Sequence, residues 1–241
     1  MIPWLERTEL LLGSEKLEKL QNANVLVVGV GGVGAYAAEM IARAGIGRIT
    51  IVDADTVSVS NINRQLPALH STVGREKCAV LGERFRDINP EIQLTCITQF
   101  VTEADVDALL DREPFGYVVD AVDTLAPKIA LIKGTLDRCI PLVSSMGAGG
   151  KTDPTQLEIA DISKTHHCPL ARTVRSRLHK LGIDRGFSAV FSAEPVREGA
   201  VILCDEQNKR SNLGTISYTP AMFGICCASV VIRDLIGELE K

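Results

Sequence analysis

Residues 24–34 read NVLVVGVGGVG, and this stretch decides the fold. Its first part, 24–30, is a continuous apolar run rich in β-branched residues, which predicts a buried strand of a parallel sheet. The glycines at 29, 31 and 34 fit G-x-G-x-x-G, a pattern typical of the turn between such a strand and a helix. In that turn, backbone N–H groups can approach a polyphosphate at the positive end of the helix. We therefore expect a nucleotide-binding strand-turn-helix unit here.

The segments that follow predict a doubly wound sheet. A helix is expected over 31–44, ending at Gly45, and a second strand over 48–52. Further strands are expected at 92–100, 117–120 and 139–144, and further helices at 73–89, 103–111 and 125–138. Short strands at 156–160, 188–192 and 200–204 would extend the sheet. The alternation predicts a Rossmann-like, doubly wound α/β fold with a mostly parallel sheet and a C-terminal sheet extension.

Length and composition favour one soluble domain. The chain has 241 residues, of which 46% are hydrophobic and 23% charged, and no Pro/Ser-rich linker divides it, so a single domain over 1–241 is expected. The first residues show no secretory signal, which predicts a cytoplasmic protein. The apolar stretch 221–232 is shorter than the ~20 residues a membrane span needs, so we expect a core helix and no membrane association.

The cysteines do not predict a disulfide framework or a zinc site. The chain has seven, an odd number, with irregular spacing and no C-x-x-C pair. Buried reduced thiols are the favoured interpretation. For Cys168, which follows two histidines that could lower its pKa, a nucleophilic role is the less favoured alternative.

The polar residues after the glycine turn shift the expected ligand from a dinucleotide to ATP. Asp53 lies at the end of the second strand, where a carboxylate can accept hydrogen bonds from a ribose. From the glycine turn alone, NAD or FAD would be the favoured ligand. However, Asn61, Arg64, Gln65 and Lys77 follow. Two amides and two cations suit a triphosphate, and a carboxylate-held Mg²⁺ would stabilise a leaving pyrophosphate.

Five ordered motifs carry a family resemblance: the glycine turn, D-x-D-x-V at 53–57, N-x-N-R-Q at 61–65, G-x-x-K at 74–77 and D-A-x-D at 120–123. In this order and spacing they resemble the adenylation domain of ubiquitin-activating-type enzymes. Within that family, residues 147–156 and 161–194 make the chain most similar to the bacterial branch that dehydrates threonylcarbamoyladenosine in tRNA.

The resemblance implies a set of site residues, with ATP and Mg²⁺ as ligands. The implied nucleotide-binding set is Gly29, Gly31, Gly32, Gly34, Asp53, Asp55, Asn61, Arg64, Gln65, Lys77 and Asp123. Asp123 would also place the Mg²⁺. Arg64, Lys77 and Asp123 would act in catalysis together with Arg7, because in family homodimers an N-terminal arginine enters the neighbouring subunit's ATP site.

The segment 163–185 is a candidate tRNA-binding surface inserted in the domain. It carries one acidic residue and six basic ones: Lys164, Arg172, Arg175, Arg177, Lys180 and Arg185. In a protein of net charge −4 this segregation suits contact with phosphates, although a solvated helix face would have the same composition.

The predicted reaction is an ATP-dependent cyclising dehydration. ATP would adenylate the threonyl carboxylate of the modified adenosine, and ring closure would release AMP after pyrophosphate has left. The alternative is adenylation of the C-terminal glycine of a small ubiquitin-like sulfur carrier, although such enzymes generally carry two C-x-x-C pairs. An NAD-dependent oxidoreductase and a nucleotide sensor are alternatives from other classes. The resemblance also implies a cysteine-desulfurase or sulfur-acceptor system as a partner.

Overall fold

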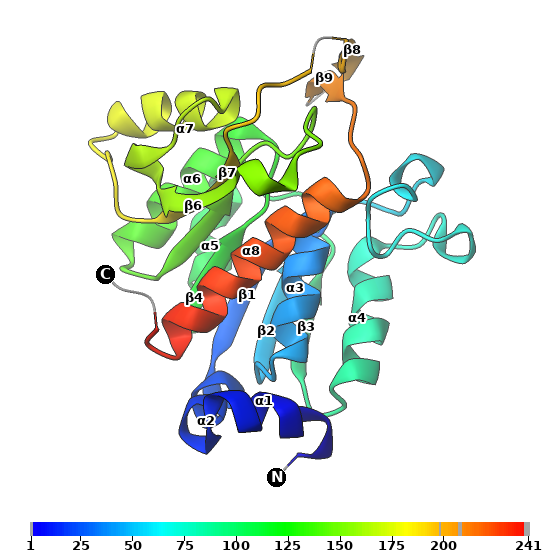
Figure 1. Ribbon diagram of the computed structural model, residues 1–241, viewed down its shortest axis with the longest axis vertical. Helices are drawn as coiled ribbons and strands as arrows, with labels where there is room; N and C mark the ends of the chain where they lie inside the picture. The colour runs from blue at the N-terminus through cyan, green and yellow to red at the C-terminus, as the bar shows by residue number, and fades with distance from the viewer. Residues whose placement is uncertain (1, 198, 207–208, 239–241) are drawn as a thin grey trace.

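A computed structural model describes residues 2–197, 199–206 and 209–238, and its centre is a seven-stranded sheet in the order β3-β2-β1-β4-β5-β7-β6 (Figure 1). Every neighbouring pair in this sheet is parallel except β6 with β7. The doubly wound fold is therefore confirmed, and β7 and β6 form the C-terminal extension. The strands are β1 (Asn24–Val28), β2 (Arg48–Val52), β3 (Gln93–Ile97), β4 (Tyr117–Asp120), β5 (Leu142–Ser145), β6 (Leu157–Asp161) and β7 (Ser188–Ser192).

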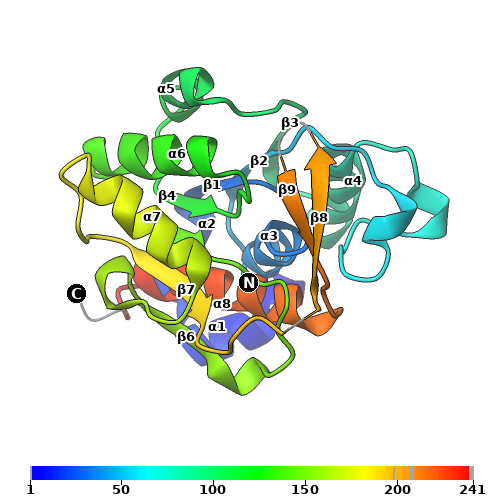
Figure 2. The ribbon, with the colours of Figure 1, turned by 90° about the horizontal axis from the view of Figure 1, so that it is seen from above.

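Helices cover both faces of the sheet, each over its own apolar core (Figure 2). One face carries α3 (Gly34–Arg43), α4 (Lys77–Ile88) and α8 (Tyr218–Leu235), and the other carries α5 (Val106–Leu110), α6 (Leu125–Asp137) and α7 (Pro169–His179). Two N-terminal helices, α1 (Glu6–Leu12) and α2 (Ser14–Asn22), lie at the edge where the parallel strands begin (Figure 1). The opposite edge, where these strands end, is left for loops.

Several predicted boundaries were wrong at the turns. The helix expected from residue 73 begins at Lys77, because Gly74 has a left-handed backbone conformation (φ +87°) that a helix cannot continue. The helix expected over 103–111 is a 3-10 turn followed by α5. The strand expected from residue 139 begins at Leu142, because Cys139 ends the preceding helix in a left-handed conformation (φ +54°).

The strand expected at 200–204 does not belong to the main sheet, which corrects part of the predicted extension. It is β8 (Val201–Glu206), which pairs only with β9 (Lys209–Leu213) in a separate antiparallel hairpin. The hairpin stands above the edge where the parallel strands end (Figure 1).

The apolar segment near the C-terminus is a core helix, as predicted. In the described part of the chain, α8 is the one helix long and apolar enough to cross a membrane by length and composition. However, it packs along α3 and contributes Phe223, Cys227 and Val230, all fully buried, to the core (Figure 1). Its apolar character is explained by this packing.

Candidate nucleotide site

The ends of β1 and β4 meet at the point where the sheet order reverses. From β1 the chain builds β2 and β3 on one side, and it then returns to place β4 on the other. In open α/β sheets, ligands bind in the crevice at such a point, outside the carboxyl ends of the strands. The glycine turn after β1 lies here, and α3 starts at Gly34 without a side-chain cap on its first turn. Since no side chain caps this helix start, its positive end suits an anion.

Two glycines of this turn are required by close backbone contacts. A Cβ on Gly34 would lie 1.8 Å from the carbonyl oxygen of Gly29. Gly29 itself has φ +84°, and a Cβ there would lie 2.8 Å from the carbonyl oxygen of Ala121. The turn is thus packed directly against the chain that leaves β4.

The other two glycines face side chains instead of backbone. Gly31 lies under Gln65, whose Nε2 would be 3.7 Å from an added Cβ, and Gly32 lies against Pro220 at the start of α8, at 3.1 Å. The segment that carries Gln65 and the start of α8 therefore both pack against the glycine turn.

Asp53 holds the glycine turn in place. Its Oδ2 accepts a hydrogen bond from the N–H of Val30 (2.8 Å), and its Oδ1 accepts one from the N–H of Asp55 (2.8 Å). The sequence predicted a ribose ligand at this position, and the remaining lone pairs can still serve one. The structure adds a positioning task that only the fold makes visible.

Lys77 and Asp55 form an ion pair at the edge of the site. The Lys77 side chain is 4% exposed, and its Nζ lies 2.6 Å from Asp55 Oδ2 and 3.9 Å from Asp53 Oδ1. Because burying an ammonium group is costly without a partner, the two carboxylates fix its position. The D-x-D motif and the lysine motif thus act as one unit.

The N-x-N-R-Q segment lies across the glycine turn. Asn61 Oδ1 accepts a hydrogen bond from the N–H of Ser58 (3.0 Å) and so caps its own turn. Arg64 Nη1 donates to the carbonyl of Ser60 and to Asn63 Oδ1, both at 2.8 Å. Within the described residues, the remaining N–H groups of Arg64 have no partner and are available to a ligand.

Gln65 provides a test of whether a nucleotide fits. Its Oε1 is buried without a hydrogen-bond partner among the described residues, and its amide lies above Gly31. A buried acceptor without a donor is destabilising, so such groups usually mark a water or ligand position. A hydroxyl or amino group of a bound nucleotide would supply the donor. The residues therefore fit ATP.

The chain that follows β4 supplies the candidate Mg²⁺ ligand. Asp123 is exposed three residues beyond the end of this strand. Mg²⁺ at nucleotide sites typically takes one or two carboxylates and phosphate oxygens. The described ranges contain no group of three or more His, Cys, Asp and Glu side chains that could hold a metal alone.

A buried ion pair shapes this segment, and the sequence analysis assigned it no role. Lys128 Nζ lies 2.7 Å from Asp120 Oδ2, and both side chains are fully buried. Lys128 also donates to the carbonyl of Val122 (3.0 Å), and Ser144 donates to Asp120 (2.6 Å). The pair fixes residues 121–123, which contact Gly29 and carry Asp123.

The basic segment begins at the same edge of the sheet. Leu170, in the first turn of α7, lies next to Gly147, which follows β5 (Figure 1). Five of the six predicted tRNA-binding residues are exposed: Lys164, Arg172, Arg177, Lys180 and Arg185. Arg175 differs, because it is partly buried and its Nη1 donates to the carbonyl of Thr165 (2.7 Å). Its position indicates that it holds the loop before α7.

Of the six cysteines whose side chains are described, Cys78, Cys168 and Cys227 are buried as predicted, whereas Cys96 and Cys226 are only partly buried and Cys139 is exposed. Burial raises the pKa of Cys78 to about 12, and it also raises the pKa values of Cys96, Cys226 and Cys227. Cys168 is buried as well, directly before α7. Cys139 is exposed, because the turn after α6 points it outward, and this corrects the expectation for that residue.

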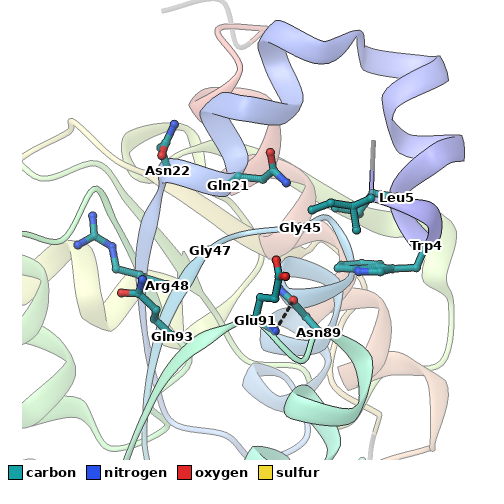
Figure 3. Close-up of a pocket in the computed structure, with 11 residues that line it drawn as sticks. Trp4, Leu5, Gln21, Asn22, Gly45, Gly47, Arg48, Asn89, Glu91 and Gln93 are labelled. Carbon is teal, nitrogen blue, oxygen red and sulfur yellow. Dashed lines mark hydrogen bonds between the residues drawn. The ribbon is translucent and has the colours of Figure 1, made fainter.

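Arg7 lies far from the glycine turn of its own chain. It is exposed on α1, at the edge where the strands begin (Figure 1). A cavity of about 250 Å³ lies at this edge, and Figure 3 shows Trp4, Gln21 and Glu91 around it. No residue of the predicted nucleotide set lines this cavity. Arg7 can therefore take part in nucleotide binding only in the site of another copy.

Known proteins resemble this chain over its full length. The profile described as the ThiF family matches residues 5–241. The tRNA threonylcarbamoyladenosine dehydratase of Bacillus subtilis is 44% identical over 100% of this chain and 97% of its own. The crystal structure of the E. coli tRNA N6-threonylcarbamoyladenosine dehydratase in complex with ATP has a TM-score of 0.89 and 37% identity, covering 99% of this chain and 97% of its own.

A relative from another branch matches only half of the chain. The molybdopterin-synthase adenylyltransferase of E. coli is 36% identical over 53% of this chain and 50% of its own. The similarity to that carrier-activating enzyme therefore stops short of the full length, whereas the similarity to the dehydratases does not.

Proposed function

The chain belongs to the ThiF family, and from this premise we propose that it catalyses the ATP-dependent cyclising dehydration of threonylcarbamoyladenosine in tRNA. The observation that carries the proposal is the full-length similarity to a dehydratase of that name, at 44% identity. The site supports it, because Arg64 packs against Gly32 of the glycine turn, and Lys77 is held by Asp55 at the end of the neighbouring strand, as cations for a polyphosphate would be. The half-length match to an adenylyltransferase does not favour the carrier-protein alternative.

The first step is adenylation of a carboxylate. An oxygen of the threonyl carboxylate attacks the α-phosphorus of ATP, and pyrophosphate leaves with the electron pair of the broken P–O bond. Negative charge grows on the leaving group, and fixed cations stabilise it. We assign this role to Arg64 and Lys77. Mg²⁺ would neutralise part of the phosphate charge, and Asp123 would hold it.

The second step is ring closure. An atom of the carbamoyl group attacks the activated acyl carbon, AMP leaves with the former carboxylate oxygen, and the attacking group gives up its proton. Attacking group and acyl carbon belong to one nucleoside, so proximity supplies much of the acceleration. A protein nucleophile is not needed, which agrees with a buried Cys168.

We further propose that the active form is a homodimer in which Arg7 completes the site of the neighbouring copy. Two observations support this. Arg7 cannot reach the site of its own chain, and its helix α1 has no buried residues, with Leu10 88% exposed and Leu11 82% exposed. Such apolar exposure suits a covered interface.

We propose that tRNA binds the exposed basic residues on and around α7. These residues belong to segment 163–185, which is inserted in the single domain 1–241. Phosphate contacts of this kind orient a nucleic acid without reading its bases. We place the enzyme in the cytoplasm and expect no structural zinc. The family resemblance implies a cysteine-desulfurase or sulfur-acceptor system as a further partner.

The proposal is tested with purified protein and tRNA that carries threonylcarbamoyladenosine. We expect ATP and Mg²⁺ to convert the nucleoside to a product lighter by one water, with one AMP formed per product, measured by mass spectrometry of digested tRNA. The Arg64→Ala variant serves as the control and should form little product. In cells lacking the protein the cyclised nucleoside should disappear, and its persistence there would contradict the assignment.

A further inference from the structure

The carboxamide of Asn63 joins two segments that close over the glycine turn. Its Oδ1 accepts a hydrogen bond from Arg64 Nη1 (2.8 Å), and its Nδ2 donates to the carbonyl of Thr215 (3.0 Å). Only one orientation of the amide satisfies both contacts, because the guanidinium is purely a donor and the carbonyl purely an acceptor. Asn63 lies inside the N-x-N-R-Q motif, but no nucleotide-binding role was predicted for it.

The Thr215 carbonyl is a fixed point. The N–H of Gly214 donates to the carbonyl of Ala200 (2.7 Å), and the Gly214 carbonyl accepts from the N–H of Gly150 (2.8 Å). A few residues later α8 begins, where Pro220 packs against Gly32. The segment is thus anchored to the loop after β5 on one side and to the glycine turn on the other.

Arg64 depends on Asn63 for its position. Its guanidinium sits on a long side chain that loses considerable rotamer freedom when it is held in one place. Among the described residues, Nη1 donates to the Ser60 carbonyl and to Asn63 Oδ1, and Ser60 is in the same local turn. Asn63 is the contact that relates the guanidinium to the segment before α8, and hence to the far wall of the crevice.

We infer that Asn63 is a positioning residue for the adenylation step, which holds Arg64 toward the phosphates by anchoring it to the Thr215 carbonyl. This inference rests on the proposed function. It adds a residue that contacts no substrate atom itself and acts through Arg64. It also links the nucleotide side of the crevice to the loop after β5, from which the basic helix α7 is reached.

The test compares Asn63→Ala with Asn22→Ala, the same change at an exposed position on α2, at the opposite edge of the sheet. We expect Asn63→Ala to lower kcat/KM for ATP by about 10- to 100-fold, as for loss of a hydrogen bond to a charged group. Asn22→Ala should leave it unchanged. Because residue 63 is exposed, both variants should unfold at nearly the wild-type temperature.

A double-mutant cycle separates positioning from a structural effect. In an Arg64→Ala background, Asn63→Ala should cause almost no further loss, because the group it positions is gone. An equal loss in both backgrounds would overturn the inference. The affinity for ATP with Mg²⁺ is also measured without tRNA for the same four proteins of the cycle. If wild-type protein leaves the modified tRNA unchanged while this cycle still shows coupling, the proposed function fails and the positioning role stands.

A second variant, Asn63→Asp, keeps the test decisive should Asn63→Ala fold poorly. Its carboxylate still accepts from Arg64 but cannot donate to the Thr215 carbonyl, and it adds a negative charge beside the phosphate site. The added charge alone can raise KM for ATP, so the informative quantity is the coupling: the combined effect of Asn63→Asp and Arg64→Ala on KM should differ from the sum of the two single effects. Additive effects would contradict the inference.

Discussion

Gly34 is the residue with the least freedom in the candidate site. A Cβ at this position would lie 1.8 Å from the Gly29 carbonyl oxygen, and no side-chain rotation relieves this contact, because the backbone fixes both the Cβ and the carbonyl. The turn would have to open, and with it the first turn of α3, where we propose that the phosphates bind.

The Gly34→Ala variant should therefore lose ATP binding and lower the unfolding free energy by at least ~2 kcal/mol, measured by ATP titration and by denaturant unfolding. The control is Gly116→Ala, where an added Cβ would lie 3.5 Å from the Asn24 carbonyl oxygen, an ordinary contact. ATP affinity at the wild-type level in Gly34→Ala would show that the turn does not cradle the nucleotide.

At the scale of elements, Glu39 joins α3 to α4 on one face of the sheet. Its side chain is 5% exposed, and it pairs with Arg43 of its own helix (2.8 Å) and with Arg84 of α4 (Nη2 to Oε1, 3.0 Å). Burial alone would raise the pKa of Glu39, but hydrogen bonds from Arg84 and then Arg43 bring the pKa below its ordinary value. The carboxylate form is thus favoured in the folded state.

The stability of the protein at acidic pH should depend on the ion pairs of Glu39. A glutamate whose pKa is lower in the folded state contributes stability above its unfolded pKa of about 4.3, and this contribution is lost as the pH falls through the folded pKa. We expect Glu39→Gln to reduce the unfolding free energy at pH 7 and to flatten its decrease below pH ~4.3, measured by urea unfolding across that range. A decrease as steep as that of the wild type would exclude Glu39 as a cause.

At the scale of the whole molecule, the shared-site dimer makes a complementation prediction. Arg7→Ala and Arg64→Ala should each be nearly inactive alone, because each removes a cation from every site. In a mixed dimer, one of the two sites has both arginines. Mixing the variants under conditions that allow subunit exchange should therefore restore activity, up to about a quarter of the wild-type level if exchange is random and both variants contribute equally. No recovery, with exchange demonstrated, would argue against Arg7 acting across the interface.

The basic surface makes a second prediction at this scale. Arg172→Glu should raise KM for tRNA and reduce the dependence of log affinity on log salt by about one unit per lost phosphate contact, without changing ATP affinity. Arg112→Glu, an equal charge reversal at an exposed position just before β4, is the matched control. Equal effects of both variants would indicate a response to net charge and not to a defined surface.

The sequence by itself determined the class of fold and the chemistry of the site. The buried strand before Gly29 and the glycine spacing were readable because period and turn chemistry are local properties of the chain, and the order of the motifs from Asp53 to Asp123 carried the family resemblance. The core helix α8 was also predicted, since its apolar length is local too.

Only the tertiary structure decided how those residues hold one another. Three contacts join positions up to 152 residues apart: the hydrogen bond from the Val30 N–H to the Asp53 carboxylate, the buried pair of Asp120 and Lys128, and the bridge from Asn63 to Thr215. The placement of β8 outside the main sheet is of the same kind. The sequence sets which polar groups are available. A hydrogen bond between segments far apart in the sequence forms only when the packing of the whole chain brings donor and acceptor together, so it is a property of the fold.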